Sequence, residues 1–152
     1  MKEAQDAKWV LLIPPQVADG AAFARPAAAD VRGFGYAEFY LATGAAADVV
    51  GESGTSLAPK LEECDTDSVT AGDWTAIPNA QLAAVIPATN DKQYKIDIDL
   101  MNSVRKPFIR PKALTAGATG AGVALCGVCR LSKPQMGMLT AAQRGLAENV
   151  IV

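Results

Sequence analysis

The sequence predicts an all-β fold: a single β-sandwich or jelly-roll-like domain with an extended N-terminal segment and a short C-terminal tail. Short runs of β-branched and aromatic residues recur between turns rich in Gly and Pro. One run, residues 93–100, alternates strictly between apolar and polar side chains, which is the period of a half-buried strand. The 152 residues fit one domain, which we divide into an arm or loop at 14–33, a sandwich body at 34–134 and a tail at 135–152.

The N-terminal part is predicted to be a strand followed by an arm. The strand, Lys8 to Ile13, is expected to stop at Pro14-Pro15, because proline cannot donate to a ladder. Residues 14–33 are dominated by Ala, Gly, Pro and Asp. The large apolar residues of this stretch are Val17, Phe23 and Val31. The stretch is long for a structureless loop, so it either lies across a neighbouring molecule or contains a short helix near 27–29, and we expect it to serve binding more than folding.

The first half of the body is predicted to hold short strands. Tyr36 to Leu41 is aromatic-rich and lies between glycines, and Val49-Val50 precedes a turn at 51–54. Ser56 to Cys64 alternates in character, and Pro59 favours an edge position for it. Short strands are also expected between Asp73 and the proline at 87.

The second half of the body carries the clearest patterns. Gln93 to Leu100 places its apolar residues on one face and its charges on the other. Arg105 to Lys112 contains two prolines, which favours a position near an edge. Ala121 to Arg130 is apolar and small, as expected of a central strand. These three strands are predicted to form a meander, and a short helix is expected at 141–149 in the tail.

Composition excludes several classes of function. The chain has no histidine, so it lacks the usual general base and the commonest metal ligand, and we expect no catalytic residues. A net charge of −2, with no cluster of Lys and Arg as large as a nucleic-acid face needs, argues against nucleic acid. No apolar run is long enough to span a membrane, and the charged start is unlike a secretory signal. A non-enzymatic protein made in a cytoplasm-like setting is expected.

The three cysteines are expected to be free thiols. Cys126 and Cys129 form a Cys-x-x-Cys, which in other contexts marks a redox dithiol or half of a zinc site. In a strand, residues three apart point to opposite faces, so the two sulfurs should diverge. Zinc would need two further ligands, for which only Cys64 and carboxylates are available. We therefore expect no metal and no cofactor.

Three other patterns are weighed against plainer explanations. Glu62, Glu63, Asp65 and Asp67 could bind Ca²⁺, but they lack the spacing of a calcium loop, and a solvated strand end is favoured. The Gly-rich run 117–122 lacks the Lys-Ser/Thr of a phosphate-binding loop and is predicted to be a turn. The local basic stripe at 105–112 is expected to meet an acidic protein surface.

Residues 57–134 contain a succession of strand patterns. Leu61 to Asp65 precedes a loop with Asp73-Trp74-Thr75, and the basic run Arg105 to Arg110 precedes a final apolar run from Leu125 to Pro134. This order resembles a widespread group of small head proteins of tailed bacteriophages, encoded near the major capsid protein, which includes capsid decoration and cement proteins. The resemblance covers about half of the chain and rests on structural patterns, with no reactive residue among them.

The resemblance implies a virion structural protein on the capsid surface, made in the host cytoplasm. Its expected partners are the major capsid protein and further copies of itself on the shell, with neither nucleic acid nor membrane bound. The candidate capsid-contact residues are Val17, Phe23, Val31, Arg105, Lys106, Arg110 and Lys112. Two alternatives stay open: another virion component, such as a head fibre base or a tail protein, and a carbohydrate-binding sandwich, which needs exposed aromatic side chains.

Overall fold

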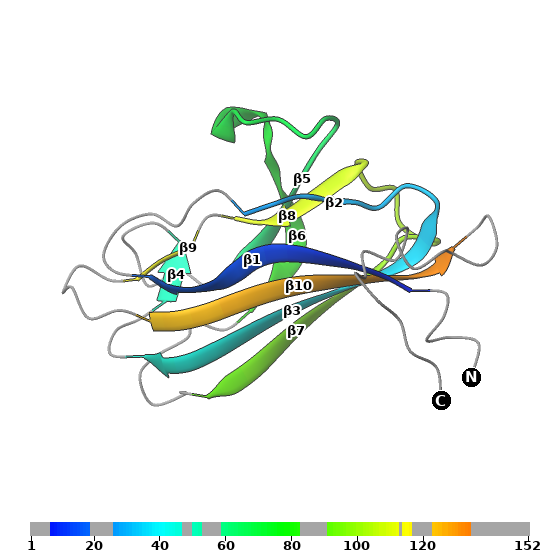
Figure 1. Cartoon of the computed structure of the whole chain (residues 1–152). Helices are drawn as coiled ribbons and strands as arrows, with labels where there is room; N and C mark the ends of the chain where they lie inside the picture. The colour runs from blue at the N-terminus through cyan, green and yellow to red at the C-terminus, as the bar shows by residue number, and fades with distance from the viewer. Residues whose placement is uncertain are drawn as a thin grey trace, which may run out of the picture.

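The predicted all-β sandwich is confirmed by a computed structural model, which describes residues 7–18, 26–46, 50–52, 59–82, 91–112, 114–116 and 123–134 (Figure 1). The strands are β1 (Lys8–Ala18), β2 (Ala29–Asp30), β3 (Phe34–Ala46), β4 (Val50–Glu52), β5 (Lys60–Cys64), β6 (Thr75–Gln81), β7 (Lys92–Asp99), β8 (Phe108–Pro111), β9 (Leu114–Ala116) and β10 (Val123–Pro134). A single 3-10 turn, η1 (Ala71–Asp73), interrupts the strands of the described chain. Within these residues no helix is long and apolar enough to cross a membrane.

The described strands form two four-stranded antiparallel sheets and a two-stranded ribbon. Sheet A has the order β1-β10-β3-β7 and sheet B the order β2-β8-β5-β6. The ribbon pairs β4 with β9. In Figure 1 the four strands of sheet A run side by side below those of sheet B. Each sheet therefore has one face toward the other sheet and one face outward.

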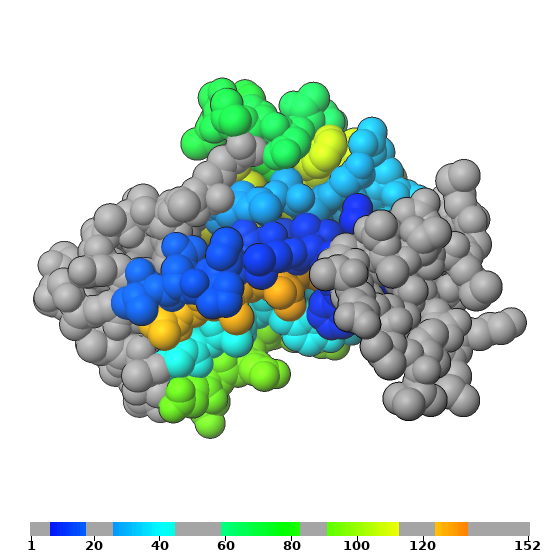
Figure 2. All heavy atoms as spheres, in the orientation of Figure 1, coloured from blue at the N-terminus to red at the C-terminus, as the bar shows by residue number. Residues whose placement is uncertain are grey.

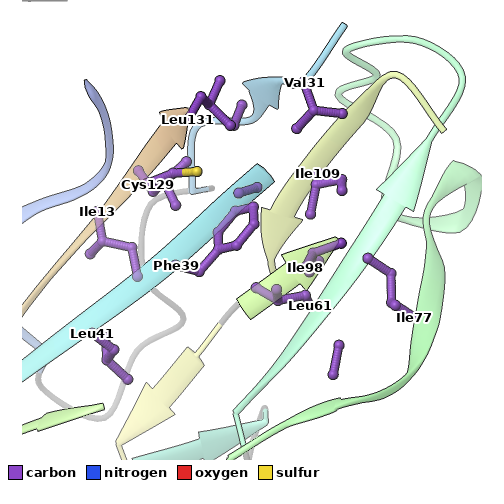
Figure 3. Close-up of a cluster of buried hydrophobic side chains, with 14 of the residues drawn as sticks. Ile13, Val31, Phe39, Leu41, Leu61, Ile77, Ile98, Ile109, Cys129 and Leu131 are labelled. Atoms are coloured by element: carbon purple, nitrogen blue, oxygen red, sulfur yellow. The ribbon is translucent and has the colours of Figure 1, made fainter. Parts of the chain in front are cut away.

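The core lies between the two sheets and is built from their inward side chains (Figure 3). Sheet A contributes Ile13, Phe39 and Leu131, and sheet B contributes Leu61 and Ile109. The side chains of Ile13, Ile109 and Leu131 are almost completely buried. Gly127 of β10 faces Ile13 across the register, and a Cβ there would lie 3.2 Å from the Ile13 side chain. This close approach explains a glycine in the middle of a central strand.

The N-terminal strand is longer than the sequence pattern predicts. β1 continues through Pro14-Pro15 to Ala18 and pairs with β10 on both sides of the prolines. The register shifts between Leu11 and Ile13 and again between Ile13 and Gln16, so the exposed prolines fall in an irregular stretch of an edge strand. Proline is tolerated at such a place because its position does not have to donate a backbone hydrogen bond to the neighbouring strand.

Most of the described part of the predicted arm belongs to the fold, so the prediction that 14–33 is an arm or loop is wrong for these residues. Ala29 and Asp30 form β2 against β8, Pro26 and Val31 are buried, and the Ala27 amide donates to the Leu12 carbonyl at 2.9 Å. Phe23 and the rest of 19–25 lie outside the described residues, as do the Gly-rich run 117–122 and the tail from 135 onward.

The remaining strands follow their sequence patterns to different degrees. β7 keeps the predicted alternation, with Ile98 buried and Asp97 and Asp99 exposed, and β10 is central in sheet A as predicted. The predicted meander is wrong, because β7 and β10 belong to sheet A and β8 to sheet B. The predicted edge position of the strand containing Pro59 is also wrong, since β5 lies between β8 and β6. Pro59 immediately precedes β5, so it costs the ladder no donor.

Candidate binding surface

Most side chains of the predicted basic stripe form ion pairs with carboxylates of the same chain. Arg110 of β8 is buried, and its Nε and Nη2 both lie 2.7 Å from Oε1 of Glu62 on β5. Its guanidinium carbon lies 3.9 Å from the centre of the Trp74 ring, a cation–π distance. The predicted role of Arg110 in contacting a shell is therefore wrong, because the residue is enclosed by its own sheet and the loop that precedes β6.

The flanking cations are also paired. Arg105 Nη1 lies 3.6 Å from Glu63 Oε1, and Lys106 Nζ lies 3.0 Å from Asp65 Oδ2. The bond to Asp65 raises the pKa of Lys106. The backbone amide of Lys106 donates to Glu63 at 3.2 Å. Cations of the stripe thus pair with Glu62, Glu63 and Asp65, three of the four acidic residues weighed above as calcium ligands.

The other predicted contact residues differ in how far their side chains are exposed. Val31 is 6% exposed and belongs to the core, so its predicted contact with a partner is wrong. Lys112 is half-buried, and its backbone amide donates to the Lys60 carbonyl. Val17 is 65% exposed on β1 and is available to a partner. Phe23 lies outside the described residues.

The outward face of sheet A carries apolar side chains along its length. Three of the large hydrophobic residues that the described chain exposes lie on β1: Trp9 at 38%, Leu11 at 52% and Val17 at 65%. Side chains that pair across an antiparallel ladder share a face, so the register identifies their neighbours. We call the set the apolar strip, comprising Trp9, Leu11 and Val17 of β1, Tyr40 and Ala42 of β3, and Ala124, Cys126 and Val128 of β10. Figure 2 shows β1, in blue, at the surface beside β10, in orange.

Two shallow grooves lie in the surface of the apolar strip. One, of about 370 Å³, is lined by Trp9, Tyr40, Ala42, Cys126 and Val128, together with Gln93 and Leu41. The other, of about 450 Å³, lies toward the far end of β1 and includes Val17 and Ala124. The rings of Trp9 and Tyr40 lie over β10, with centroids 6.3 Å apart and planes inclined by 30°.

Four charged side chains beside the strip, Glu38, Lys95, Asp97 and Arg130, form a network. Glu38 is 8% exposed, and its Oε2 lies 2.5 Å from Arg130 Nη1. Its Oε1 accepts a hydrogen bond from the Tyr40 hydroxyl at 3.1 Å and lies 3.5 Å from Lys95 Nζ. Lys95 also lies 3.0 Å from Asp97. Burial raises the pKa of Glu38, but the bonds from Arg130 and Tyr40 outweigh it and leave this pKa below its usual value.

The two cysteines of the Cys-x-x-Cys point to opposite faces of β10, as predicted. Cys129 is fully buried in the core, where burial raises the pKa of its thiol. Cys126 is half-buried and lines both grooves of the apolar strip. Neither cysteine, nor any other described Cys, Asp or Glu, belongs to a cluster of three that could hold a metal ion.

Sequence reasoning missed the strip, although a signal for it exists. A strand with one wet face alternates in polarity, whereas Trp9-Val-Leu-Leu-Ile13 is apolar at every position. In β1 the outward positions, Trp9 and Leu11, are therefore as apolar as the inward ones. The chain matches no protein-family model and no curated protein. The proposed function therefore rests on this surface, with its aromatic pair and its charge network.

Proposed function

We propose that this chain is a non-enzymatic virion structural protein, a decoration or cement subunit that binds the major capsid protein on the outside of a tailed-phage head. The observation that carries the proposal is the apolar strip, because exposed apolar patches of this kind mark protein–protein contact sites. The order of strand patterns in residues 57–134 points to phage head proteins in particular. The all-β sandwich is compatible with that resemblance.

A decoration role fits the physical character of the surface. A capsid repeats the same binding site many times, so contacts that are individually weak add up when subunits also contact one another. The strip supplies apolar area for such contacts, and its neighbouring charges already have partners within the chain. Binding would therefore depend on burial of apolar surface more than on salt-sensitive attraction.

The test is co-sedimentation of the purified chain with empty shells of the phage that encodes it. We expect saturable binding at a fixed ratio of this chain to major capsid protein. Binding that weakens little when the salt concentration is raised would agree with an apolar contact. Binding to isolated tails but not to heads would replace the decoration role by the tail alternative, and binding to neither would refute a virion role.

One observation favours a carbohydrate-binding module as a second candidate. Trp9 and Tyr40 present adjacent rings on an outward sheet face, and sugar rings stack on such surfaces. The Tyr40 hydroxyl, however, is already donated to Glu38. A glycan array and quenching of Trp9 fluorescence would test this candidate. Trp9→Ala should abolish both binding and quenching, because the other tryptophan, Trp74, is buried in the loop before β6.

A further inference from the structure

We infer that the free edge of β7 accepts an extended segment of another protein by antiparallel β-strand addition, with the alternate apolar side chains of the segment in the crevice between β7 and β6. These two strands are outer strands of sheets A and B, and both line this crevice (Figure 1). The crevice is separate from the apolar strip, which lies on the outward face of sheet A. The inference therefore goes beyond the proposed function and does not depend on it.

β7 lacks the features that protect the other outer strands of the two sheets. An exposed edge strand is a template for pairing with another chain, and proteins block it with prolines, bulges or short strands. β1 contains Pro14-Pro15 and two register shifts, and β2 has two residues. β6 contains Pro78 and a register shift against β5, and its Asn79 has a φ of 62°. β7 is eight residues long, contains no proline and pairs with β3 in an unbroken register.

Backbone groups of β7 point to its free edge. The Leu100 amide donates to the Gly35 carbonyl at 3.0 Å, in continuation of the register between β7 and β3. Because the residues of an antiparallel strand bond alternately to one side and the other, the amides and carbonyls of Lys95 and Asp97 face away from β3. Among the described residues, none pairs with these groups. An added strand therefore finds backbone donors and acceptors at the spacing of a β ladder.

The crevice beside this edge has a volume of about 300 Å³ and an apolar interior. Its buried and half-buried apolar lining comes from both sheets, namely from Ile77 and Ala80 of β6 and from Ile96 and Ile98 of β7. The exposed part of the lining includes the polar residues Asn79, Asp97, Asp99 and Asn102. Successive side chains of a strand point to opposite faces, so every second side chain of an added segment would enter the apolar interior.

Arg105 has a hydrogen-bond donor without an acceptor beside the crevice. The residue lines the crevice, and its Nε is buried with no hydrogen-bond partner in the described chain. Its Nη1 lies 3.6 Å from Glu63 Oε1, which is too long for a hydrogen bond. A buried donor without a partner costs free energy. A segment along the crevice brings backbone carbonyls, which are acceptors of the kind that Arg105 lacks.

The charges beside β7 favour a segment with a basic residue among its outward side chains. The Nζ of Lys95 lies 3.0 Å from Asp97 and 3.5 Å from Glu38 of β3, so it lies over sheet A and does not block the edge. Asp99 forms no ion pair within the described chain, and hydrogen bonds from Asn102, above all from its side-chain amide, hold the pKa of Asp99 below its usual value. Opposite charges that face each other across a ladder are favourable. A Lys or Arg opposite Asp99 would pair with this carboxylate.

The probe is a synthetic octapeptide of the sequence Lys-Val-Thr-Ile-Lys-Val-Thr-Ile, with acetyl and amide ends. Residues opposite each other in an antiparallel pair lie on the same face, so the Lys and Thr nitrogens should point to β7 and the Val and Ile nitrogens away from it. N-methylation of the Val and Ile nitrogens therefore permits pairing with β7 and prevents the peptide from stacking on itself. N-methylation of the Lys and Thr nitrogens instead should prevent pairing with β7.

The first experiment is an NMR titration of the isotope-labelled full chain with each peptide. We expect the form methylated on Val and Ile to bind saturably, with a dissociation constant below about 1 mM and the largest shifts at the amides of Lys95 and Asp97. The form methylated on Lys and Thr has the same composition, is the matched control and should shift neither amide. Equal binding of both forms, or binding of neither at about 2 mM, overturns the inference.

A pair of variants tests the backbone edge itself. Lys95→Pro removes one donor on the free edge and spares the hydrogen bonds to β3, because this amide faces away from β3. Lys95→Ala removes the same ion pairs but keeps the amide, so it is the matched control. Lys95→Pro should weaken binding of the peptide by at least about tenfold relative to Lys95→Ala, and equal affinities would contradict the inference. If Lys95→Pro fails to fold, the two peptides still decide the question on the wild-type chain.

Hydrogen exchange identifies any other occupant of this edge. The amides of Lys95 and Asp97 should exchange quickly in the free protein and slowly in the peptide complex. Slow exchange in dilute free protein would mean that another segment of this chain pairs with β7, and slow exchange only at high concentration would mean that a second copy does. Either result overturns the inference, and neither bears on the binding of shells by the apolar strip.

Discussion

Arg110 illustrates how a charged residue that looks available in the sequence becomes buried by the fold. It lies on β8 directly opposite Glu62 of β5, and the two form a buried pair capped by Trp74. Removing one partner of such a pair leaves the other charge buried without compensation, which costs far more than the pair contributes net.

We therefore expect Arg110→Ala to destabilise the protein by about 3–5 kcal/mol, because Glu62 would remain buried and unpaired. The measurement is urea unfolding followed by fluorescence. Lys106→Ala, which breaks a pair with the exposed Asp65, is the control and should change stability little. Equal effects of the two substitutions would show that Arg110 is solvated.

Glu38 makes stability depend on pH in the acid range. Its pKa in the folded protein lies below the usual value, so its interactions stabilise the fold above the ordinary glutamate pKa near 4.3 and are lost as the pH falls through the folded pKa. We expect Glu38→Gln to lower the melting temperature at pH 7, and the difference from wild type to shrink below about pH 4. A difference that stays constant from pH 7 to pH 3 would exclude an ionised Glu38 as the source.

Among the elements, β7 gives the sharpest contrast between its two faces. Ile98 is 6% exposed and packs in the core, whereas its neighbour Asp97 is exposed and pairs with Lys95. Ile98→Asp should cost more than about 3 kcal/mol, since it buries an unpaired charge. Asp97→Ala should leave thermal unfolding nearly unchanged, and similar shifts in melting temperature for both variants would mean that the register of β7 on β3 is wrong.

The elements also show what the sequence predicts well. β7 and β10 were predicted correctly because their patterns report burial directly: one alternates, and the other is apolar on both faces. β1 and β5 were misjudged because proline was taken as a stop or an edge signal wherever it occurred. Pro14-Pro15 lies at a register break and Pro59 immediately before a strand, and neither position can be recognised without knowing the pairing.

The candidate surface was harder to predict than the fold. The basic run at 105–112 looks like a surface stripe until its neighbour β5 is known to place Glu62 and Glu63 opposite it. Strand pairing between residues more than 40 positions apart decides whether those charges are free. Of the predicted contact residues that the structure describes, Val17 alone lies on the apolar strip. Trp9 and Leu11 are not among the predicted contact residues, although the run 9–13 is apolar at every position, including the positions that point outward.

At the scale of the whole molecule, the two sheets differ in how far their outward faces are covered by other parts of the described chain. Sheet B covers part of its own outward face with the loop that carries Trp74, and its charges are paired across β5 and β8. Sheet A leaves an aromatic pair and exposed aliphatic side chains on its outward face. This asymmetry gives the sandwich one side suited to association, which is what the proposed decoration role requires.

Electron cryomicroscopy of empty shells incubated with the purified chain tests the decoration role most directly. We predict sandwich-sized density at symmetry-related positions on the outer surface of the shell, with Trp9, Leu11 and Val17 covered by another protein subunit. Shells without added density, or bound sandwiches whose outward face of sheet A is open to solvent, would contradict it.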